Sequence, residues 1–260
     1  MRLINMSSAK VADYFKNNDL VIFSAGSLEN HGYHNPVGVD TIIPERILEL
    51  IDQKSDVLIA PTLPYGSADS HLGFPGTVSL GPDVLYAVIN KIVESLYMVG
   101  AKRFLFINGH GGNTAAFDRV CLEWHYKGVL AANIDWWAIL PDLNPEWKCG
   151  HGCAIETSAV MHIEPSAVDL SKVEEMNLKN DLGDILPTSF LKTVKHKGVG
   201  IQMMRPTISI TNNGWFGGDH NHPKKSNAEF GEEIITTVSD FLIDFIEAFK
   251  LAKLPPNVKS

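Results

Sequence analysis

Potential metal ligands follow a short apolar run near the start of the chain. The stretch GSLENHGYHNPVGVD, residues 26–40, contains Glu29, His31 and Asp40, and it comes soon after the apolar run LVIF at residues 20–23. Neutral imidazole together with carboxylate suits zinc, manganese or iron better than calcium. The stretch therefore predicts a divalent-metal site. An aspartate that lends one oxygen to each of two ions, about 3.5–4 Å apart, would make that site binuclear.

Further metal-competent side chains follow other apolar runs. His110 lies in the motif NGHGGN, residues 108–113, which comes directly after the apolar run RFLFI. Three other candidates follow later or shorter runs, and they are His71, His151 and Glu156. The glycines around His110 have no side chains, so a ligand could approach the backbone closely there.

The elements that must position these residues are predicted from the apolar pattern. Strands are expected at 20–24, 56–60, 103–107, 128–135 and 208–210. Helices are expected at 41–54, 82–98, 114–125, 156–163 and 226–250, and the polar stretch 165–200 is expected to run over the surface. Strands that alternate with helices predict an α/β fold with three layers, α/β/α, around a mostly parallel central sheet. Sites in such sheets lie outside the carboxyl ends of the strands, where these candidates fall.

Composition restricts the class of protein and of partner. The chain has 260 residues, 45% of them apolar, which suits a single domain over 1–260 with a sizeable core. A net charge of -8 disfavours nucleic-acid binding and leaves a small molecule as the expected partner. The start has no long apolar segment of a signal peptide, and no run is long enough for a membrane span. With only three cysteines, we expect no disulfide framework and a cytoplasmic location.

Simpler explanations exist for several of these residues. Asn-Gly-His is compatible with a plain turn, and GHGG could bind an anion at a helix start, although it lacks the Lys and Ser/Thr of a P-loop. Cys149, His151 and Cys153 could belong to a zinc site, but no second cluster accompanies them. Cys153 could also be a nucleophile beside His151, but no nucleophile elbow is present. His34, among other single histidines, is expected to be an ordinary polar loop residue.

Several motifs together resemble the creatininase (creatinine amidohydrolase) family. They are GSLENHG at 26–32 with Asp40, FPGT at 74–77, NGHGGN at 108–113, HG at 151–152 with ETS at 156–158, and GGD at 217–219. They occur in the family's order and span about half the chain. Each is weak alone, but the set is specific.

The resemblance implies a creatininase-like fold, a binuclear metal centre, hydrolase chemistry and a homo-oligomer, often a hexamer. It carries the family's metal ligands over to Glu29, His31, Asp40, His110 and Glu156. Asp40 would bridge the ions, which would be zinc, manganese or iron. Creatininase has a glutamate at the position of Gly112, and Glu156 is the expected replacement. We expect His151 to carry the proton to the leaving group.

Departures from creatininase concern the substrate. Gly111 replaces an aromatic residue, and Lys148, which either reverses the local charge or points to solvent, replaces an acid beside Trp147. The expected substrate-binding residues are His71, Trp147, Gly111 and Gly112, with Trp147 as a lid. The function predicted is metal-activated attack of hydroxide on a carbonyl of a small cyclic amide, with cleavage of a C–N bond. Creatinine itself is not expected. The alternatives are a C–C hydrolase of a cyclic diketone (an inosose-type cyclitol) and a non-catalytic metal- or anion-binding protein.

Overall fold

The computed structural model describes residues 1–218 and 221–258, and within them four parallel strands form the central sheet. The strands are β1 (Leu20–Ala25), β2 (Leu58–Ile59), β3 (Arg103–Asn108) and β4 (Leu130–Asp135), in the order β2-β1-β3-β4. Ala25 at the end of β1 pairs with Asn108 at the end of β3, which pairs with Asp135 of β4. The loops after these strands therefore leave the sheet at the same level.

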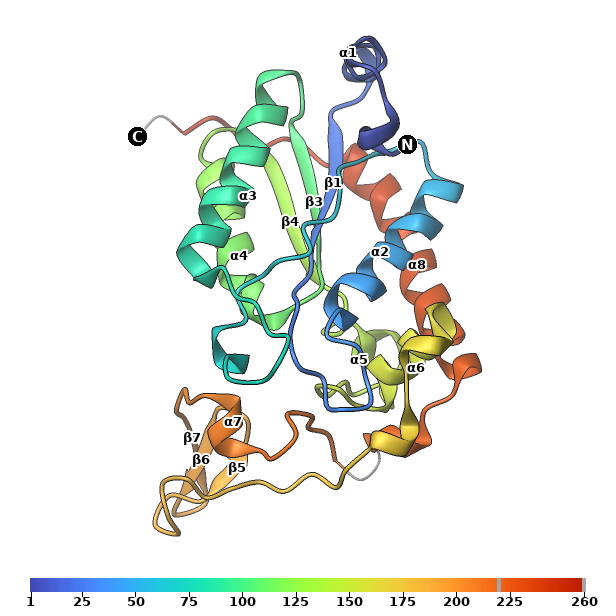
Figure 1. Ribbon diagram of the computed structural model, residues 1–260. Helices are drawn as coiled ribbons and strands as arrows, with labels where there is room; N and C mark the ends of the chain where they lie inside the picture. Colours follow the sequence, from blue (N-terminus) through green and yellow to red (C-terminus); the bar gives the residue numbers. More distant parts are fainter. Residues whose placement is uncertain (219–220, 259–260) are drawn as a thin grey trace.

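Helices cover both faces of this sheet (Figure 1). On one face lie α2 (Val39–Lys54), α6 (Ala154–Ile163) and α8 (Ala228–Leu251), and on the other α3 (Gly81–Met98) and α4 (Thr114–His125). Successive side chains of a strand point to opposite faces, so Leu20 and Ile22 of β1 join the first core while Val21 and Phe23 join the second. This arrangement confirms the predicted three-layer α/β fold with a parallel sheet.

The first helix, α1 (Ser8–Asn17), was not predicted. Tyr14 is its one buried side chain, so the helix adds little to the core, although Val11, Tyr14 and Phe15 recur at the spacing of an amphipathic helix. Ser7 caps the helix by accepting a hydrogen bond from the Lys10 amide. The Tyr14 hydroxyl donates to the Leu20 carbonyl at 2.6 Å and accepts from the Leu58 amide at 3.2 Å, which ties the starts of β1 and β2 together.

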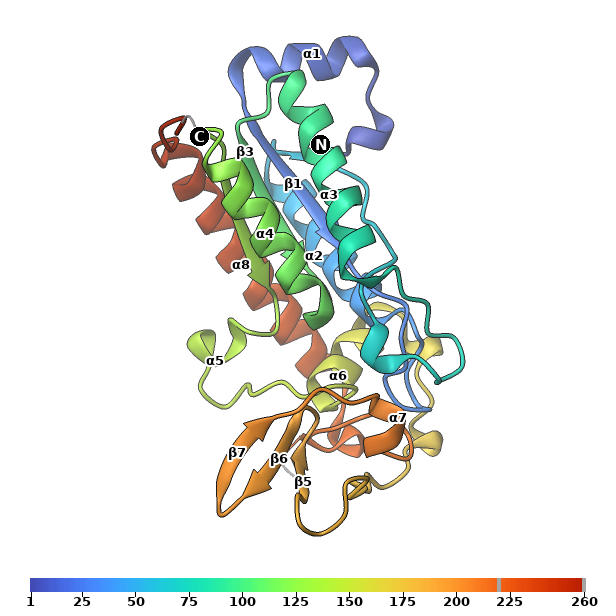
Figure 2. The same cartoon turned by 90° about the vertical axis from the view of Figure 1, so that its left-hand side faces the viewer.

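The polar stretch after α6 contains a second sheet, which the sequence did not predict. It consists of β5 (Thr188–Phe190), β6 (Thr193–His196) and β7 (Val199–Gln202), all antiparallel, and it lies beyond the carboxyl ends of the central strands (Figure 2). The strand expected at 208–210 is wrong, because Thr207–Ile210 forms the short helix α7. Three residues are too few to separate a strand period from a helical one, and Pro206 at the N-cap favours a helix start.

The remaining short helix, α5 (Leu140–Leu143), follows β4 and contacts α8. No helix in the described part of the chain has the length and apolar character needed to cross a membrane.

His34 connects the loop after β1 to the start of α6, which corrects its expected role as an ordinary loop residue. Its side chain is only 1% exposed. Its Nε2 lies 3.0 Å from the Gly152 carbonyl and 3.2 Å from the Thr157 hydroxyl. Burial lowers the pKa of His34 from 6.5 to about 4, although the hydrogen bond to Gly152 partly opposes the shift. The ring is therefore neutral in the folded protein.

We expect this histidine to make stability depend on pH. Between pH 6.5 and 4 the unfolded chain holds a proton on His34 that the folded chain lacks, so its stabilising contribution is present above about pH 6.5 and is lost below about pH 4. The loss amounts to about 3 kcal/mol. The free energy of unfolding can be measured in urea for the wild type and for His34→Gln. The difference between these two free energies should shrink by about this amount from pH 7.5 to 4. A difference that stays constant would contradict a neutral buried His34.

Candidate metal centre

The loops and helix starts at the carboxyl edge of the sheet bring the five predicted ligands together. Glu29 and His31 lie in the loop after β1, and His110 comes two residues after the end of β3. Asp40 and Glu156 lie in the first turns of α2 and α6, where the helix dipole favours a negative charge. Each of the five residues is at most 7% exposed. Buried charges are costly unless they are paired or bind a metal, so other groups in the site must compensate the charges of this cluster.

Asp40 belongs to two groups of side chains whose ligand atoms lie within 4.8 Å of one another. In the first, His110 Nδ1 lies 3.2 Å from Glu29 Oε2 and 3.1 Å from Asp40 Oδ2. In the second, His31 Nε2 lies 3.0 Å from Asp40 Oδ1 and 3.9 Å from Glu156 Oε2. Each oxygen of Asp40 therefore faces a different group, which is the geometry of a bridging carboxylate.

The tautomers of the two histidines test whether this donor set fits a cation. His31 Nδ1 lies 3.2 Å from the Glu29 carbonyl, and His110 Nε2 lies 3.1 Å from the Ser67 carbonyl. When those nitrogens carry the protons, the other nitrogens turn lone pairs toward the carboxylates. Among the described residues, His31 Nε2, Glu29 Oε1 and Asp40 Oδ2 are buried without a hydrogen-bond partner. Facing acceptors repel one another unless a cation lies between them, so the arrangement fits divalent metal.

The pKa values of the site residues show how strong the local field is. Burial alone would lower the pKa of His31, but the negative charge of Asp40 beside it outweighs burial and raises the pKa to about 10. Burial would raise the pKa of Asp40, but His31 and His110 hold it well below the usual range. Burial raises the pKa of Glu156 well above its usual value. The site thus attracts positive charge, and metal would have to displace protons from it.

Two asparagines hold the loops of the site in place. The Asn108 side chain accepts a hydrogen bond from the His110 amide at 3.0 Å and donates one to Asp135 at 2.8 Å. Asn113 accepts from the Ser67 amide at 2.9 Å and donates to the Gly26 carbonyl at 3.0 Å. Both side chains therefore act on the loop backbone that positions His110.

His151 lies beside the two groups, on the turn that leads into α6. Gly152 has φ +59°, and a Cβ there would lie 2.4 Å from the His31 carbonyl oxygen, so only glycine allows this close approach. The backbone of His151 exchanges two hydrogen bonds of 2.7 Å with Phe216, and the two rings stack at 5.1 Å.

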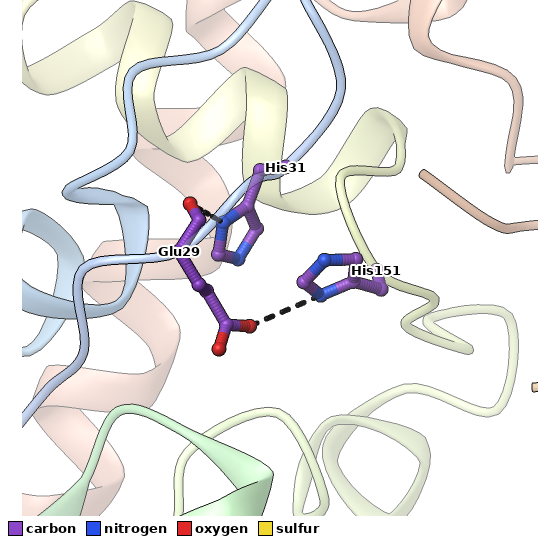
Figure 3. A group of neighbouring side chains, drawn as sticks. All are labelled: Glu29, His31 and His151. Carbon is purple, nitrogen blue, oxygen red and sulfur yellow. Dashed lines mark hydrogen bonds and ion pairs between the residues drawn. The ribbon is translucent and has the colours of Figure 1, made fainter. Parts of the chain in front are cut away.

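The orientation of the His151 ring leaves one nitrogen free to exchange protons. Its Nε2 lies 2.8 Å from the Asn30 carbonyl, and its Nδ1 lies 3.7 Å from Glu29 Oε1 (Figure 3). Burial, together with the charges of His31 and His71, lowers the pKa of His151 well below its usual value. A neutral ring that donates through Nε2 has its lone pair on Nδ1, so Nδ1 can accept a proton in the site. His151 also belongs to a third metal-competent group, with Glu29 and His31.

A cavity of about 520 Å³ opens onto this centre. His71, Gly111 and Gly112 line it with the candidate ligands Glu29, Asp40, His110 and Glu156. His71 is buried, and its Nε2 lies 3.7 Å from Glu29 Oε1. The structure thus places these three predicted substrate-binding residues at the cavity.

The structure corrects the role expected of Trp147 and favours one of the two alternatives for Lys148. Trp147 is 6% exposed and packs in the core against Phe230, so it does not form a lid. The lid was expected because Trp147 matches a tryptophan of creatininase, but here its large apolar surface is buried. Lys148 is exposed outside the cavity lining, in agreement with the solvent alternative. The tryptophan that lines the cavity is Trp137.

The glycines around His110 have different reasons to be glycine. A Cβ on Gly109 would lie 1.9 Å from the Asp40 carbonyl oxygen, and one on Gly112 would lie 2.0 Å from that of Ser67. These two are therefore required by contacts within the protein and not by the approach of a ligand. A Cβ on Gly111 would meet only Trp137, at 3.7 Å. This position leaves open space in the cavity.

The far wall of the cavity comes from a segment in which the sequence showed no functional signal. Phe190, Leu191 and Lys192 belong to the β5–β6 hairpin, and Met204, Arg205 and Thr207 follow β7. No motif spacing relates these residues to the metal ligands. They enter the site only because the second sheet lies across the carboxyl edge of the first.

The fold and the site together define an α/β protein with a candidate binuclear metal centre. The sequence profile of the family described as "Creatininase: Creatinine amidohydrolase" matches residues 4–246. The chain belongs to this family. The family segment GGD ends at Asp219, which lies outside the described residues.

Relatives of known activity are hydrolases of different substrates. The creatinine amidohydrolase of Pseudomonas putida is 28% identical over 176 residues, 59% of this chain and 68% of that protein. The mycofactocin precursor peptide peptidase of Mycolicibacterium smegmatis is 32% identical over 155 residues, 57% of this chain and 60% of the peptidase. The 3-dehydro-scyllo-inosose hydrolase of Thermotoga maritima is 23% identical over 281 residues, 96% of this chain and 85% of that enzyme.

Solved structures share the fold at low sequence identity. Creatinine amidohydrolase superposes with a TM-score of 0.73 at 21% identity and covers 97% of this chain and 98% of its own. Two further creatininase structures, one described as Zn–Zn type and one as the Mn form, each give a TM-score of 0.72 at 22% identity. Each covers 96% of this chain and at least 98% of its own.

The two-group arrangement predicts different losses of metal from different ligands. Glu156 belongs to the group with His31 and Asp40 but not to the group with Glu29 and His110. Glu156→Gln keeps an oxygen that can accept the 2.6 Å hydrogen bond from Gly152 and removes the charge. We expect metal content, measured by elemental mass spectrometry, to fall from about two equivalents to about one. Loss of both ions to the same extent, or loss of no ion, would contradict the placement of Glu156 in the group with His31 and Asp40.

Proposed function

We propose that this protein is a metal-dependent hydrolase that cleaves a C–N bond of a small, cyclic amide. The observation that carries the proposal is Asp40, whose two oxygens face separate groups of carboxylate and imidazole ligands in one buried cavity. Membership of a family whose named members are hydrolases supports it, as do the zinc and manganese forms of creatininase.

In this proposal the centre holds two divalent ions, zinc, manganese or iron. Glu29, Asp40 and His110 would hold one ion, and His31, Asp40 and Glu156 the other. Divalent ions bound there would polarise a carbonyl and lower the pKa of a coordinated water toward neutrality. The buried unpartnered acceptors described above make the residues fit this role.

The side chains around the ions supply position and proton transfer. His151 is neutral, and its Nδ1 faces the cavity beside Glu29, so it can take a proton and return it to the leaving nitrogen. Its Nε2–H bond to Asn30 fixes the ring orientation. His71 lies on the same side, 4.5 Å from His151 between ring centroids, and would border the substrate.

A substrate screen tests the proposal. Metal-loaded protein should hydrolyse at least one compound from a panel of lactams, formamides and N-terminally or C-terminally blocked dipeptides, and a chelator should abolish the reaction. Turnover that survives complete removal of metal would contradict the mechanism. The panel should include cyclic diketones, because the Thermotoga relative is a hydrolase of an inosose and the alternative function is C–C hydrolysis of an inosose-type cyclic diketone. Cleavage of a diketone without cleavage of any amide would favour that alternative.

Three further expectations remain proposals: a single domain over residues 1–260, a location in the cytoplasm and a homo-oligomer such as a hexamer.

Apolar side chains on β7 support the oligomer, since Val199 is 64% exposed and Ile201 is 45% exposed. Light scattering coupled to gel filtration would measure the mass. A monomer at micromolar concentration would contradict the proposed assembly.

A further inference from the structure

We propose that Arg205 and Thr207 form a carboxylate-binding subsite in the same cavity, so that the preferred substrate is an amide that carries a carboxylate. This inference rests on the proposed hydrolase function and names a substrate class for it. Nothing in the family comparison assigns a role to these two residues. Arg205 lies between β7 and α7, Thr207 is the first residue of α7, and both line the far wall of the cavity.

Arg205 has one half of its guanidinium group occupied and the other half free. Its side chain is 7% exposed. Nη1 pairs with Asp181 and donates to the Thr188 hydroxyl at 3.0 Å, which fixes the group against the second sheet. Nε and Nη2 are buried and have no hydrogen-bond partner within the described part of the chain. Buried donors without partners cost free energy, so a bound group that satisfies them would be stabilised.

Other unpartnered polar atoms lie in the lining of the same cavity. The Thr207 hydroxyl is buried, its residue 1% exposed, and His71 Nδ1 is buried with its residue 5% exposed; neither atom has a hydrogen-bond partner among residues 1–218 and 221–258. The elements that carry them, α7 and the 3-10 helix Asp69–His71, contact each other. These atoms are unpartnered polar atoms of the lining other than the metal-facing acceptors of Glu29 and Asp40.

The geometry of the free donors favours a carboxylate. The Nε and Nη2 edge of a guanidinium presents two parallel N–H groups, which match the two oxygens of a carboxylate. Asp181 pairs with Nη1 at the other side of the group, and the exposed Lys192 adds a positive charge to the cavity lining. The Thr207 hydroxyl can donate a further hydrogen bond.

The charges of the cavity also give such a substrate a direction. Glu29, Asp40 and Glu156 make the metal side acidic, whereas Arg205 and Lys192 make the opposite wall basic. A carboxylate is attracted by the second wall, and its binding there leaves the ligand groups of the first wall to the amide carbonyl. A substrate anchored at Arg205 would therefore present its amide carbonyl toward the metal ligands.

Equilibrium binding to the metal-loaded protein tests the subsite without requiring turnover. The probes are N-acetylglycine, its neutral counterpart N-acetylglycinamide and the phosphonate acetamidomethylphosphonate, each titrated calorimetrically. The wild type should bind the carboxylate about tenfold or more tightly than the carboxamide, the range of a charge-assisted hydrogen bond. Arg205→Met should reduce this ratio to about one, because the donors are gone.

Two variants control for damage to the fold. Arg205→Lys retains a charge that can pair with Asp181 but lacks the two-donor edge, so it should also lose most of the preference. Lys195→Met removes an exposed charge from β6 of the second sheet. Lys195 lies outside the cavity lining, so this variant should keep the wild-type ratio. Metal content of each variant should match the wild type.

The outcomes separate this inference from the proposed function. Equal affinities of the wild type for the acid and the amide, or no binding of the acid, would overturn the subsite. So would tighter binding of the phosphonate than of the carboxylate, or a preference that persists in both Arg205 variants. A preference that depends on Arg205 while no amide in the panel is hydrolysed would support the subsite and contradict the hydrolase.

Discussion

Asp40→Ala is expected to remove both metal ions and with them the catalytic activity. The two oxygens of Asp40 face the two ligand groups at 3.1 Å from His110 and 3.0 Å from His31, so one substitution takes a ligand from each. We expect the metal content to fall from about two equivalents to near zero, and kcat/KM to fall on the order of 10³-fold or more as the activated water is lost.

Matched variants show whether this effect belongs to the bridge. Asp40→Asn preserves the shape of the side chain and should also lose metal, because an amide is a poor bridging ligand. Asp69→Asn removes another carboxylate from the same cavity lining, one that belongs to no metal-competent group among the described residues, and it should retain the metal. Full metal occupancy in Asp40→Ala would show that Asp40 does not bridge.

His151→Ala is expected to keep the metal and to lose most of the turnover. Its Nδ1 faces Glu29 at 3.7 Å, whereas the two complete ligand groups form without it. General acid-base groups contribute about 10²–10⁴-fold, so kcat should fall by an amount in this range while the metal content stays at the wild-type value. Stopped assays at saturating substrate, paired with elemental analysis of the same sample, measure both quantities.

The control for this variant is His162→Ala, a histidine of the same helix region that lies outside the cavity lining. It should change neither the rate nor the metal content. An unchanged kcat in His151→Ala would discard the proton-carrier role. Loss of metal in that variant would instead identify His151 as a ligand in the third group, with Glu29 and His31.

The ligands were predictable from the sequence because of the topology of a parallel sheet. Runs such as LVIF and RFLFI identify buried strands, and their carboxyl ends must meet at one edge. Glu29, His31 and His110 follow these runs at short spacing, so the rule that the carboxyl ends of parallel strands meet at one edge predicted their convergence. Asp40 follows the first run by the same rule, whereas the ligand roles, that of Glu156 among them, were carried over from the resemblance to the creatininase family.

The far wall of the cavity could not be predicted in the same way. Arg205 reaches the site because β5–β7 pack across the sheet edge, and that contact depends on tertiary structure and not on local periodicity. Trp147 shows a different error: its match to a tryptophan of creatininase suggested a lid, but burial against Phe230 places it in the core. Single side chains at the ends of long loops are determined by packing, for which a single sequence gives no direct signal.

The most direct test of the binuclear centre is the metal content per subunit of gently purified wild-type protein, measured by elemental mass spectrometry with and without added zinc or manganese. We predict about two equivalents per subunit, from ligands that include both oxygens of Asp40. Protein that contains no divalent metal and takes none up on titration would contradict the centre and the hydrolase mechanism built on it.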